Sequence, residues 1–514
     1  MAGDTVSDTI DPQASGDAAS CCGVNACCTD AEQAADPGRT VLEAKTDAGC
    51  GCVNADDRGA LPVVVIGAGP VGLAAAAHLA ERGLEFLVLE AGDRVGAAVA
   101  AWGHVRLFSP WRYDTDAAAR RLLEPTGWTA PPADDLPTGA DLVRDYLVPL
   151  SRVPALADRI RTGARVVAIS RDGADATRSI GRDEHPLLVR VRDADGTVRD
   201  VRTRAVIDAS GTWGRSNPIG HSGLPAPGEE DAAPYLAGPL PDVPGRDRAR
   251  FAGRHALVVG AGHSAAGTLL ALAELAETEP GTRITWAVRG TSVARLYGGG
   301  DADELPARGA LGTRLKEAVA AGRVELVRGF AVTGLTADGD TVRVTGTTPD
   351  GERVVTAHTV VGATGFRPDL ELLREVRVEL DPATEAPVRL APLIDPNFHS
   401  CGTVPPHGER VLAHPETGFY LAGMKSYGRA PTFLLATGYE QVRSIVAALA
   451  GDREAADTVH LDLPETGVCS TDPSGADEES ACCGSAAEPV TIGVGAPVGV
   501  GFATGQAHGR SGDA

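Results

Sequence analysis

The 514-residue chain lacks the features that mark membrane-spanning, secreted and nucleic-acid-binding proteins. No apolar run reaches the roughly 18 residues needed to cross a bilayer. The opening MAGDTVSDTI has neither the basic start nor the apolar stretch of a secretory signal. Lysine occurs only at Lys45, Lys316 and Lys425, and the net charge of −22 disfavours a nucleic acid or an anionic membrane surface as partner. We therefore expect a cytoplasmic protein that binds neither.

The chain is long enough for two or three domains with a sizeable core, and its hydrophobic content of 43% is ordinary. Residues 1–60 are rich in small and polar residues without apolar periodicity, which predicts a disordered tail, and residues 452–514 predict a second one. Between them we expect a first domain built from residues 61–218 and 358–451. A second domain with its linker, residues 219–357, is expected to interrupt it.

A strand, a glycine-rich turn, a helix and a second strand follow one another in LPVVVIGAGPVGLAAAAHLAERGLEFLVLEAG. The turn at residues 67–72, here called the first cradle, has the G-x-G-x-x-G spacing that lets backbone approach a pyrophosphate at a helix N-terminus. The second strand ends in an acid that is suitably placed to accept hydrogen bonds from ribose hydroxyls. The residues expected to bind the nucleotide are Gly67, Gly69, Pro70, Gly72 and Glu90.

The same pattern returns in RHALVVGAGHSAAGTLLALAELAE, where residues 260–267 form the second cradle. Its following strand, ITWAVR, ends in Arg289 instead of an acid. A guanidinium can pair with a 2′-phosphate, which a carboxylate would repel, so NADPH is favoured over NADH. Arg295 is near enough in sequence to share or take over this role. The residues expected to bind NADPH are Gly260, Gly262, His263, Ser264, Gly267 and Arg289.

Two β-rich segments fill the remaining parts of the domains. One predicts a hairpin that turns at residues 195–196, and the other predicts a meander that turns at residues 338–339 and 350–351. Each leads to an apolar strand and a small-residue turn, VIDASG at Gly211 and VVGATG at Gly365. The duplicated pattern predicts an α/β fold with two Rossmann-like domains, the second inserted in the first.

The paired cradles, the turns ASG and ATGFRP, and GFYLAGMKSYG before a long final helix resemble flavoproteins with two dinucleotide-binding domains. That superfamily includes flavin monooxygenases, thioredoxin reductases and glutathione-reductase-like enzymes. The resemblance covers about residues 60–450, and implies FAD in the first cradle and NADPH in the second. It also implies a helix that opens around Pro431 and points its N-terminus at the flavin. Further FAD contacts implied are Trp102, Val167, Gly211, Gly365, Gly423 and Thr432, although ordinary packing is an equal alternative for Trp102 and Val167.

Cysteine is missing from the whole stretch between Cys52 and Cys401. The disulfide reductases of this superfamily carry a redox-active cysteine pair after the first cradle or inside the NADPH domain, so the gap argues against a built-in thiol relay. Those reductases also have an aspartate after the glycine that corresponds to Gly423, where this chain has Met424 and Lys425. Molecular oxygen is then the expected electron acceptor, although the F-x-G-x-x-x-H signature of the main monooxygenase class is missing.

The closest resemblance is to flavin monooxygenases found with bacterial arsenic-resistance genes. It rests on RLFSPWRY, RLYGGG, LPARGALG, HSCGTVPPHG and MKSYGRAPTFLLATGYEQVRS. The resemblance implies a small-molecule substrate, a trivalent arsenical such as arsenite or methylarsenite. Cys401 and Lys425 are the candidate catalytic residues, with a buried inert thiol and a solvated lysine as the respective alternatives.

Paired cysteines occur in both predicted tails. CCGVNACC lacks the C-x-x-C spacing and nearby histidines of a zinc site, whereas a soft metalloid ion binds two or three thiolates and tolerates a flexible segment. Inert tails and thiol exchange are the alternatives. The candidate metal-binding residues are Cys21, Cys22, Cys27, Cys28, Cys482 and Cys483.

Two other functions remain open. One is a thioredoxin-reductase-like NADPH oxidoreductase whose tail cysteines take electrons from the flavin. The other is a flavin-bearing protein that sequesters or senses a metalloid. The sequence does not fix the oligomeric state, and an oligomer is compatible with it.

Overall fold

The computed structural model describes residues 61–291, 297, 303, 305–396, 404–431 and 433–461. No helix within these residues is long and apolar enough to cross a membrane. Several predictions of the sequence analysis fall outside the described residues. They concern the two tails over residues 1–60 and 462–514, and Cys21, Cys22, Cys27, Cys28, Arg295, Cys401, Thr432, Cys482 and Cys483.

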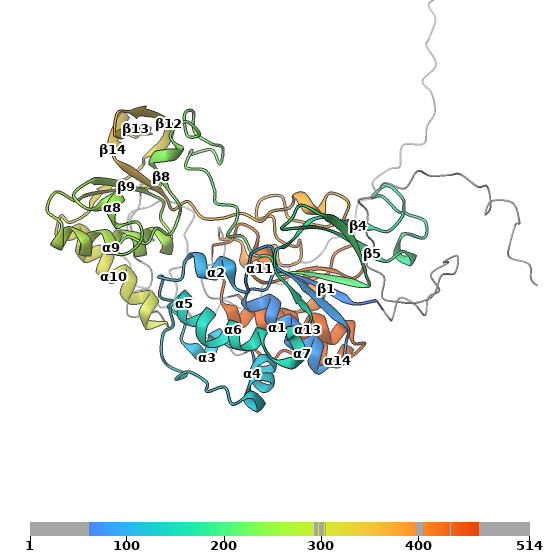
Figure 1. The fold of residues 1–514 in the computed structure, drawn as a ribbon. Helices are drawn as coiled ribbons and strands as arrows, with labels where there is room; N and C mark the ends of the chain where they lie inside the picture. The colour runs from blue at the N-terminus through green and yellow to red at the C-terminus, as the bar shows by residue number, and fades with distance from the viewer. Residues whose placement is uncertain are drawn as a thin grey trace, which may run out of the picture. The chain divides into compact units, whose positions relative to one another are not determined.

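The first domain is built on a five-stranded parallel sheet (Figure 1). Its strand order is β16 (Phe419–Leu421), β7 (Ala205–Asp208), β1 (Val63–Ile66), β2 (Phe86–Leu89) and β3 (Ile160–Arg161). Side chains of β1 alternate between two cores: Val63 and Val65 pack against the helices, and Val64 and Ile66 pack against a second sheet. That second, antiparallel sheet consists of β4 (Ala164–Arg171), β5 (Leu187–Asp193) and β6 (Val198–Thr203).

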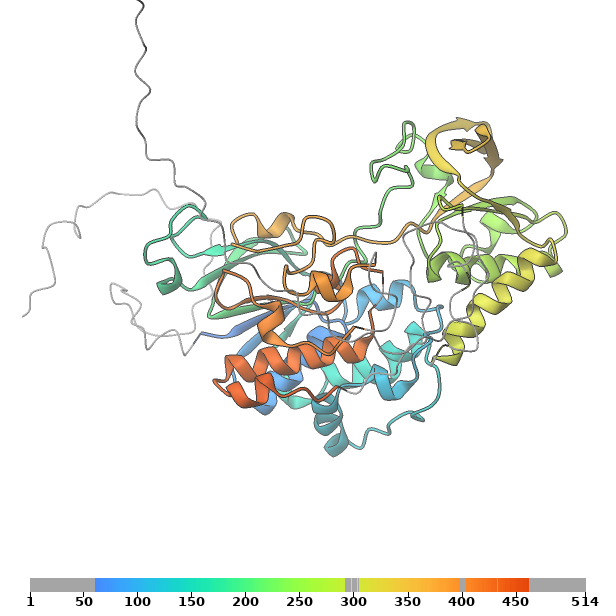
Figure 2. The same cartoon turned by 180° about the vertical axis from the view of Figure 1, so that it is seen from behind.

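The second domain repeats this layering. Its parallel sheet has the order β11 (Glu325–Val327), β10 (Arg283–Ala287), β9 (His255–Val259), β15 (Thr359–Gly362) and β8 (Leu236–Ala237). The helices cover one face, and the antiparallel strands β12 (Ala331–Asp338), β13 (Thr341–Thr348) and β14 (Gly351–Ala357) cover the other, as Figures 1 and 2 show. The fold is therefore the predicted pair of Rossmann-like α/β domains. The hairpin turn at Gly196 and the meander turns at Gly339 and Gly351 are confirmed.

Two helices follow the cradles directly, α1 (Pro70–Glu81) in the first domain and α9 (His263–Thr278) in the second. The other helices of the first domain are α2 (Ala97–Ala101), α3 (Trp111–Asp114), α4 (Ala117–Leu123), α5 (Gly139–Leu142), the π-helical turn η3 (Val143–Leu147), α6 (Val148–Ser151), α7 (Pro154–Ala157), α11 (Ala391–Ile394), α12 (Glu409–Leu412), α13 (Leu435–Leu449) and α14 (Arg453–Asp457). The second domain adds α8 (Arg248–Phe251) and α10 (Pro306–Ala320).

Three boundaries differ from the sequence analysis. The strand β15 belongs to the second domain although it follows residue 358, because it pairs with β9 and β8. Residues 453–457 form α14 instead of opening a tail, since the Asp452 side chain caps the helix at Ala455 N. The helix α13 begins at Leu435, so Pro431 lies before it and not in its first turn.

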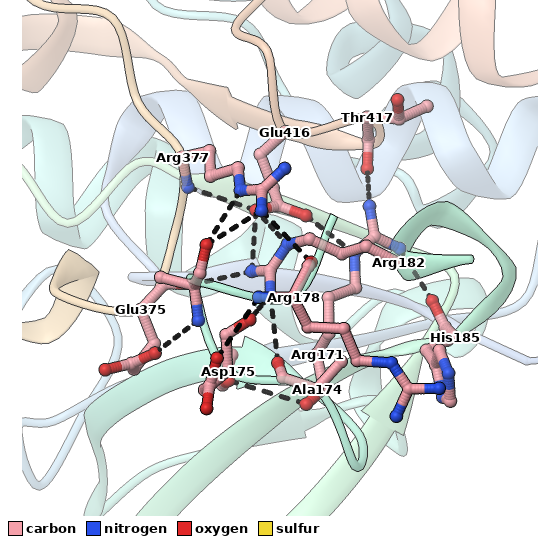
Figure 3. Close-up of polar contacts among 12 residues, drawn as sticks. Arg171, Ala174, Asp175, Arg178, Arg182, His185, Glu375, Arg377, Glu416 and Thr417 are labelled. Atoms are coloured by element: carbon pink, nitrogen blue, oxygen red, sulfur yellow. Dashed lines mark hydrogen bonds and ion pairs between the residues drawn. The ribbon is translucent and has the colours of Figure 1, made fainter. Parts of the chain in front are cut away.

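A buried charge cluster fastens the loop between β4 and β5 to the C-terminal part of the first domain (Figure 3). Glu416, with a side chain 1% exposed, accepts from Arg171 Nε at 2.6 Å, from Arg182 Nη2 at 2.9 Å and from Arg377 N at 3.0 Å. Burial raises the pKa of Glu416, but these donors outweigh it and hold the pKa below its ordinary value. The cluster thus joins segments more than 230 residues apart.

Candidate functional site

Both cradles open onto one cavity of about 1670 Å³, lined by residues of the two domains. A Cβ placed on Gly69 or on Gly262 would have no atom within 4 Å, and both glycines line the cavity. Each cradle therefore leaves open space against bare backbone, which is what a bound pyrophosphate requires. The donors are the first N–H groups of α1 and α9, which lack partners inside their helices.

In the first cradle, the helix α1 packs tightly against the glycine-rich turn and the strand β1. Gly67 has φ +96° and follows β1 directly, so the chain turns at once towards α1. A Cβ on Gly72 would lie 1.9 Å from the carbonyl oxygen of Gly67 and 3.5 Å from Val65 Cγ1. Only a glycine at position 72 lets α1 approach the turn and the strand so closely.

Glu90 stands at the end of β2 and lines the cavity. Its two carboxylate oxygens accept from Ala68 N and Gly92 N, each at 2.7 Å. These bonds fix the carboxylate against the first cradle. Each oxygen keeps a further lone pair, so the group can still accept from a ribose hydroxyl.

The second cradle is built differently. Gly260 has φ +137°, and a Cβ there would lie 2.0 Å from the carbonyl oxygen of Ala363, so this glycine lets the cradle pack against the turn after β15. A Cβ on Gly267 would meet nothing within 4 Å. Gly267 therefore faces open space, but the position that corresponds to Gly72 is Ala265, two residues earlier, which is fully buried.

His263 and Ser264 begin α9 and line the cavity. The ring centroid of His263 lies 5.2 Å from that of Phe108, which belongs to the first domain. Burial lowers the pKa of His263, and the charge of Arg308 lowers it further, so the imidazole is neutral at pH 7.

Arg289 lies just beyond β10 and lines the cavity beside the second cradle. Its Nη1 donates to the carbonyl of His221 at 3.1 Å, and other donors of the guanidinium remain available. A second arginine, Arg314 of α10, also lines the cavity and is paired with Glu274 at 2.6 Å. The sequence analysis did not identify Arg314, because it comes from a helix that follows the second strand at a distance.

Most of the further FAD contacts that the resemblance implies line the cavity, but not all of them do. Trp102, Gly211, Gly365 and Gly423 line the cavity. Val167 does not line it, whereas Arg165 and Val166, just before it on β4, do. The register of β4 against β5 shifts at this point, between Val166 and Ala168, and such an extra residue changes which side chains face a given side.

Lys425 is wholly buried and is not among the residues that line the cavity. Its Nζ bonds to Asp208 Oδ2 at 2.6 Å and to Ser210 Oγ at 3.1 Å. The alternative of a solvated lysine is therefore wrong, and the ammonium instead joins the ends of β7 and β16. A direct catalytic role for Lys425 remains a prediction that these contacts do not favour.

The turn after β16 is also held by a residue that the sequence analysis missed. Gln441 of α13 accepts from Gly423 N at 2.8 Å and donates to Ser426 Oγ at 3.0 Å. Its Nε2 lies 2.8 Å from Nε2 of the buried His407. A glutamine within an apolar helix carries no distinctive sequence signal. Within the described part of the chain, no three His, Cys, Asp or Glu side chains gather into a possible metal site.

Known protein families match two parts of the chain. The FAD dependent oxidoreductase family matches residues 62–144, which contain the first cradle. The pyridine nucleotide-disulphide oxidoreductase family matches residues 199–389, which contain the second cradle. No curated protein matches the chain by sequence.

Solved structures share the fold over most of the described residues. The bacillithiol disulfide reductase Bdr (YpdA) from Bacillus cereus is 20% identical with a TM-score of 0.58, over 76% of this chain and 99% of that one. The same reductase from Staphylococcus aureus is 16% identical with a TM-score of 0.53, over 76% and 99%. The ornithine N-hydroxylase KtzI from Kutzneria sp. 744, with reduced FAD, NADP+ and L-ornithine, is 18% identical with a TM-score of 0.51, over 77% and 99%. The solved structures show a shared fold, and the two oxidoreductase families that match residues 62–144 and 199–389 identify the chain as a flavin-dependent oxidoreductase.

Proposed function

We propose that the protein is an NADPH- and FAD-dependent monooxygenase that oxidises a soft nucleophile, a trivalent arsenical such as arsenite or methylarsenite. The observation that carries this proposal is the absence of cysteine between Cys52 and Cys401. Both cradles and both matched family segments lie inside this stretch. A disulfide pair next to the flavin cannot come from these segments, so the electrons pass to a diffusible acceptor, dioxygen.

The residues of the chain divide the task between the two cradles. The first cradle with Glu90 holds FAD, and the second cradle with His263 and Ser264 holds NADPH. FAD, when bound, accepts a hydride from NADPH and passes two electrons to dioxygen. The protein binds both nucleotides on one cavity, orients them and limits the access of water.

The choice of NADPH rests on Arg289. Its guanidinium lies at the cavity where the second strand of the second domain ends, which is the position that distinguishes a 2′-phosphate from a 2′-hydroxyl. At the corresponding end of β2 the first cradle has the carboxylate of Glu90. The two cradles therefore favour different nucleotides.

A disulfide reductase is the second candidate function. The two bacillithiol disulfide reductases have TM-scores above that of the ornithine hydroxylase, and the paired tail cysteines supply thiols that could reach a flavin. In that case the tails would accept the electrons.

One experiment separates the two functions. Purified protein loaded with FAD is supplied with NADPH, and oxygen uptake is measured with arsenite, methylarsenite or a low-molecular-weight disulfide. A matched variant carries serine at every tail cysteine. The monooxygenase is supported if an arsenical stimulates oxygen uptake and yields the pentavalent product equally in both proteins. Disulfide reduction that is lost in the serine variant, or tight arsenic binding without turnover, would contradict it.

A further inference from the structure

The first domain contains a buried acid that the nucleotide-binding roles leave unused. Asp114 ends α3 and is 0% exposed. Ser109 Oγ donates to its Oδ1 at 2.8 Å, whereas its Oδ2 is buried and has no hydrogen-bond partner among the described residues. Such an unpaired carboxylate oxygen is costly as long as the group stays ionised.

The groups around Asp114 and its neighbour Asp116 come from three other elements. Tyr439 of α13 donates its hydroxyl to the backbone carbonyl of Asp114 at 2.8 Å. The hydroxyl of Tyr146, in η3, accepts from Asp116 N at 3.0 Å. The Asp116 carboxylate lies 3.1 Å from Nε2 of His78 on α1. The two neighbouring acids thus differ, since Asp116 has an imidazole beside its carboxylate and Asp114 has only a hydroxyl.

These surroundings bring Asp114 into the range where it exchanges protons at neutral pH. Burial raises the pKa of Asp114 to about 7, although the Ser109 hydrogen bond opposes this shift. An acid with a pKa near the working pH is suited to proton transfer, because both of its forms are populated.

Ser109 connects this acid to the cavity. It lines the cavity together with Phe108, and its hydroxyl already points to Asp114. A hydroxyl can accept a proton from one side while it gives its own proton to the other. The side chain therefore bridges the buried carboxyl and the cavity onto which both cradles open.

We propose that Asp114 and Ser109 form a relay that delivers the proton consumed when dioxygen is reduced at the cavity. This proposal rests on the proposed monooxygenase function. The overall reaction is NADPH + H⁺ + O₂ + substrate → NADP⁺ + H₂O + oxidised substrate. NADPH supplies two electrons, one oxygen atom goes to the substrate, and the other leaves as water.

The relay accounts for the added proton in that balance. When Asp114 is protonated, its carboxyl donates to Ser109 Oγ, the reverse of the bond to the ionised carboxylate, and the Ser109 proton turns towards the cavity. The O–H bond of Ser109 then breaks towards the departing oxygen while a new O–H bond forms on Ser109 Oγ from the Asp114 carboxyl, which becomes a carboxylate. Because Asp114 is buried, the replacing proton enters from the cavity through the same hydroxyl. Asp114 acts through Ser109, so it is a positioning residue and proton store.

The test uses the FAD-loaded full-length protein, NADPH and dioxygen, with methylarsenite as the probe substrate. Wild type is expected to be fastest below pH 7 and to slow about tenfold per pH unit above it. Asp114→Asn is expected to lower the rate about 10²-fold at pH 6 and to remove the break in the pH profile. Ser109→Ala should reproduce both effects, and the double variant should add no further loss. Asp116→Asn, which alters the neighbouring buried acid, is the matched control and should keep the break.

The outcome is read separately from the proposed function. Anaerobic reduction of the flavin by NADPH needs no proton from this relay, so its rate should be equal in wild type and both variants. If wild type itself shows no methylarsenite-dependent oxygen uptake, the same pH profile is measured on uncoupled peroxide formation, NADPH + H⁺ + O₂ → NADP⁺ + H₂O₂. A break that survives in a folded, yellow Asp114→Asn or Ser109→Ala protein would overturn the relay.

Discussion

The two domains share one plan but solve the same nucleotide-binding problem with different contacts. In the first cradle Gly72 packs against the turn, and Glu90 accepts from Ala68 N and Gly92 N, so the carboxylate at the end of the second strand is tied back to the turn. In the second cradle the position that corresponds to Gly72 is Ala265, which is fully buried, and among the described residues Arg289 donates to the carbonyl of His221, outside the cradle. The comparison teaches that both helices pack closely behind their cradles, and that the two sites differ at the end of the second strand, where one has a carboxylate tied to the turn and the other a guanidinium that is not.

Two buried acids, one in each domain, also differ in their partners. Asp303 of the second domain is paired by two hydrogen bonds with Arg308, at 2.7 and 2.8 Å. Asp114 of the first domain accepts from the Ser109 hydroxyl, and its Oδ2 has no partner among the described residues, although Glu416 and Asp208 of the same domain are paired with cations. The ionised form of Asp114 thus lacks the kind of cation that neutralises Asp303.

The largest expected effect sharpens this contrast in buried acids. Folding raises the pKa of Asp114 from 3.8 to about 7. The folded state therefore holds this proton more tightly than the unfolded state, and the resulting stabilisation is complete below about pH 4 and is lost as the pH rises to 7. The free energy of unfolding of Asp114→Asn minus that of wild type should therefore increase by about 4 kcal/mol from pH 4 to pH 8, since each pKa unit corresponds to about 1.4 kcal/mol. Denaturant titrations at each pH measure this difference. If the free energies of unfolding of the two proteins changed equally with pH, the raised pKa of Asp114 would be contradicted.

The second prediction tests the close approach of α1 to the turn of the first cradle. Gly72→Ala places a Cβ 1.9 Å from the backbone oxygen of Gly67, so α1 must shift, and we expect a loss of about 1–3 kcal/mol in stability together with a loss of bound flavin. Gly267→Ala, in the helix α9 behind the second cradle, is the control: its Cβ meets open space, so it should gain up to about 1 kcal/mol without loss of flavin. Denaturant titrations and the flavin-to-protein ratio measure both variants. Equal effects of the two substitutions would contradict the requirement for glycine at position 72.

The smallest expected effect concerns nucleotide choice. Arg289→Ala should raise KM for NADPH about tenfold, or about 1.4 kcal/mol, and leave KM for NADH nearly unchanged, because only the 2′-phosphate loses its partner. Arg283→Ala, at the opposite end of β10, is the control and should change neither value. Steady-state kinetics with both nucleotides measures the two KM values. An equal rise in KM for NADPH and NADH would show that Arg289 does not recognise the 2′-phosphate.

Local sequence pattern was sufficient for the repeated parts of the fold. The apolar strand β1, both cradles and the turns at Gly196, Gly339 and Gly351 lie where spacing and turn chemistry predict them. These features depend on residues close together in the sequence, so their local preferences decide the structure.

Features set by distant segments could not be predicted in this way. The assignment of β15 to the second domain depends on its pairing with β9 and β8, and the burial of Lys425 depends on Asp208. Asp114 occurs in a polar stretch, RYDTD, that suggests an exposed turn. It is buried, and part of its cover comes from α13, where Tyr439, 325 residues further along the chain, bonds to its backbone carbonyl.

The insertion of one domain inside the other has a consequence for biosynthesis. The strand β16 pairs with β7, which was made about 210 residues earlier, and Glu416 must meet Arg171 and Arg182. The inserted domain is continuous in the sequence and has its own cores, so it can fold while the ribosome is still translating. The first domain must wait with the edge of β7 uncovered until the C-terminal segment emerges. A nascent chain stalled before residue 416 is therefore the state most exposed to misassociation.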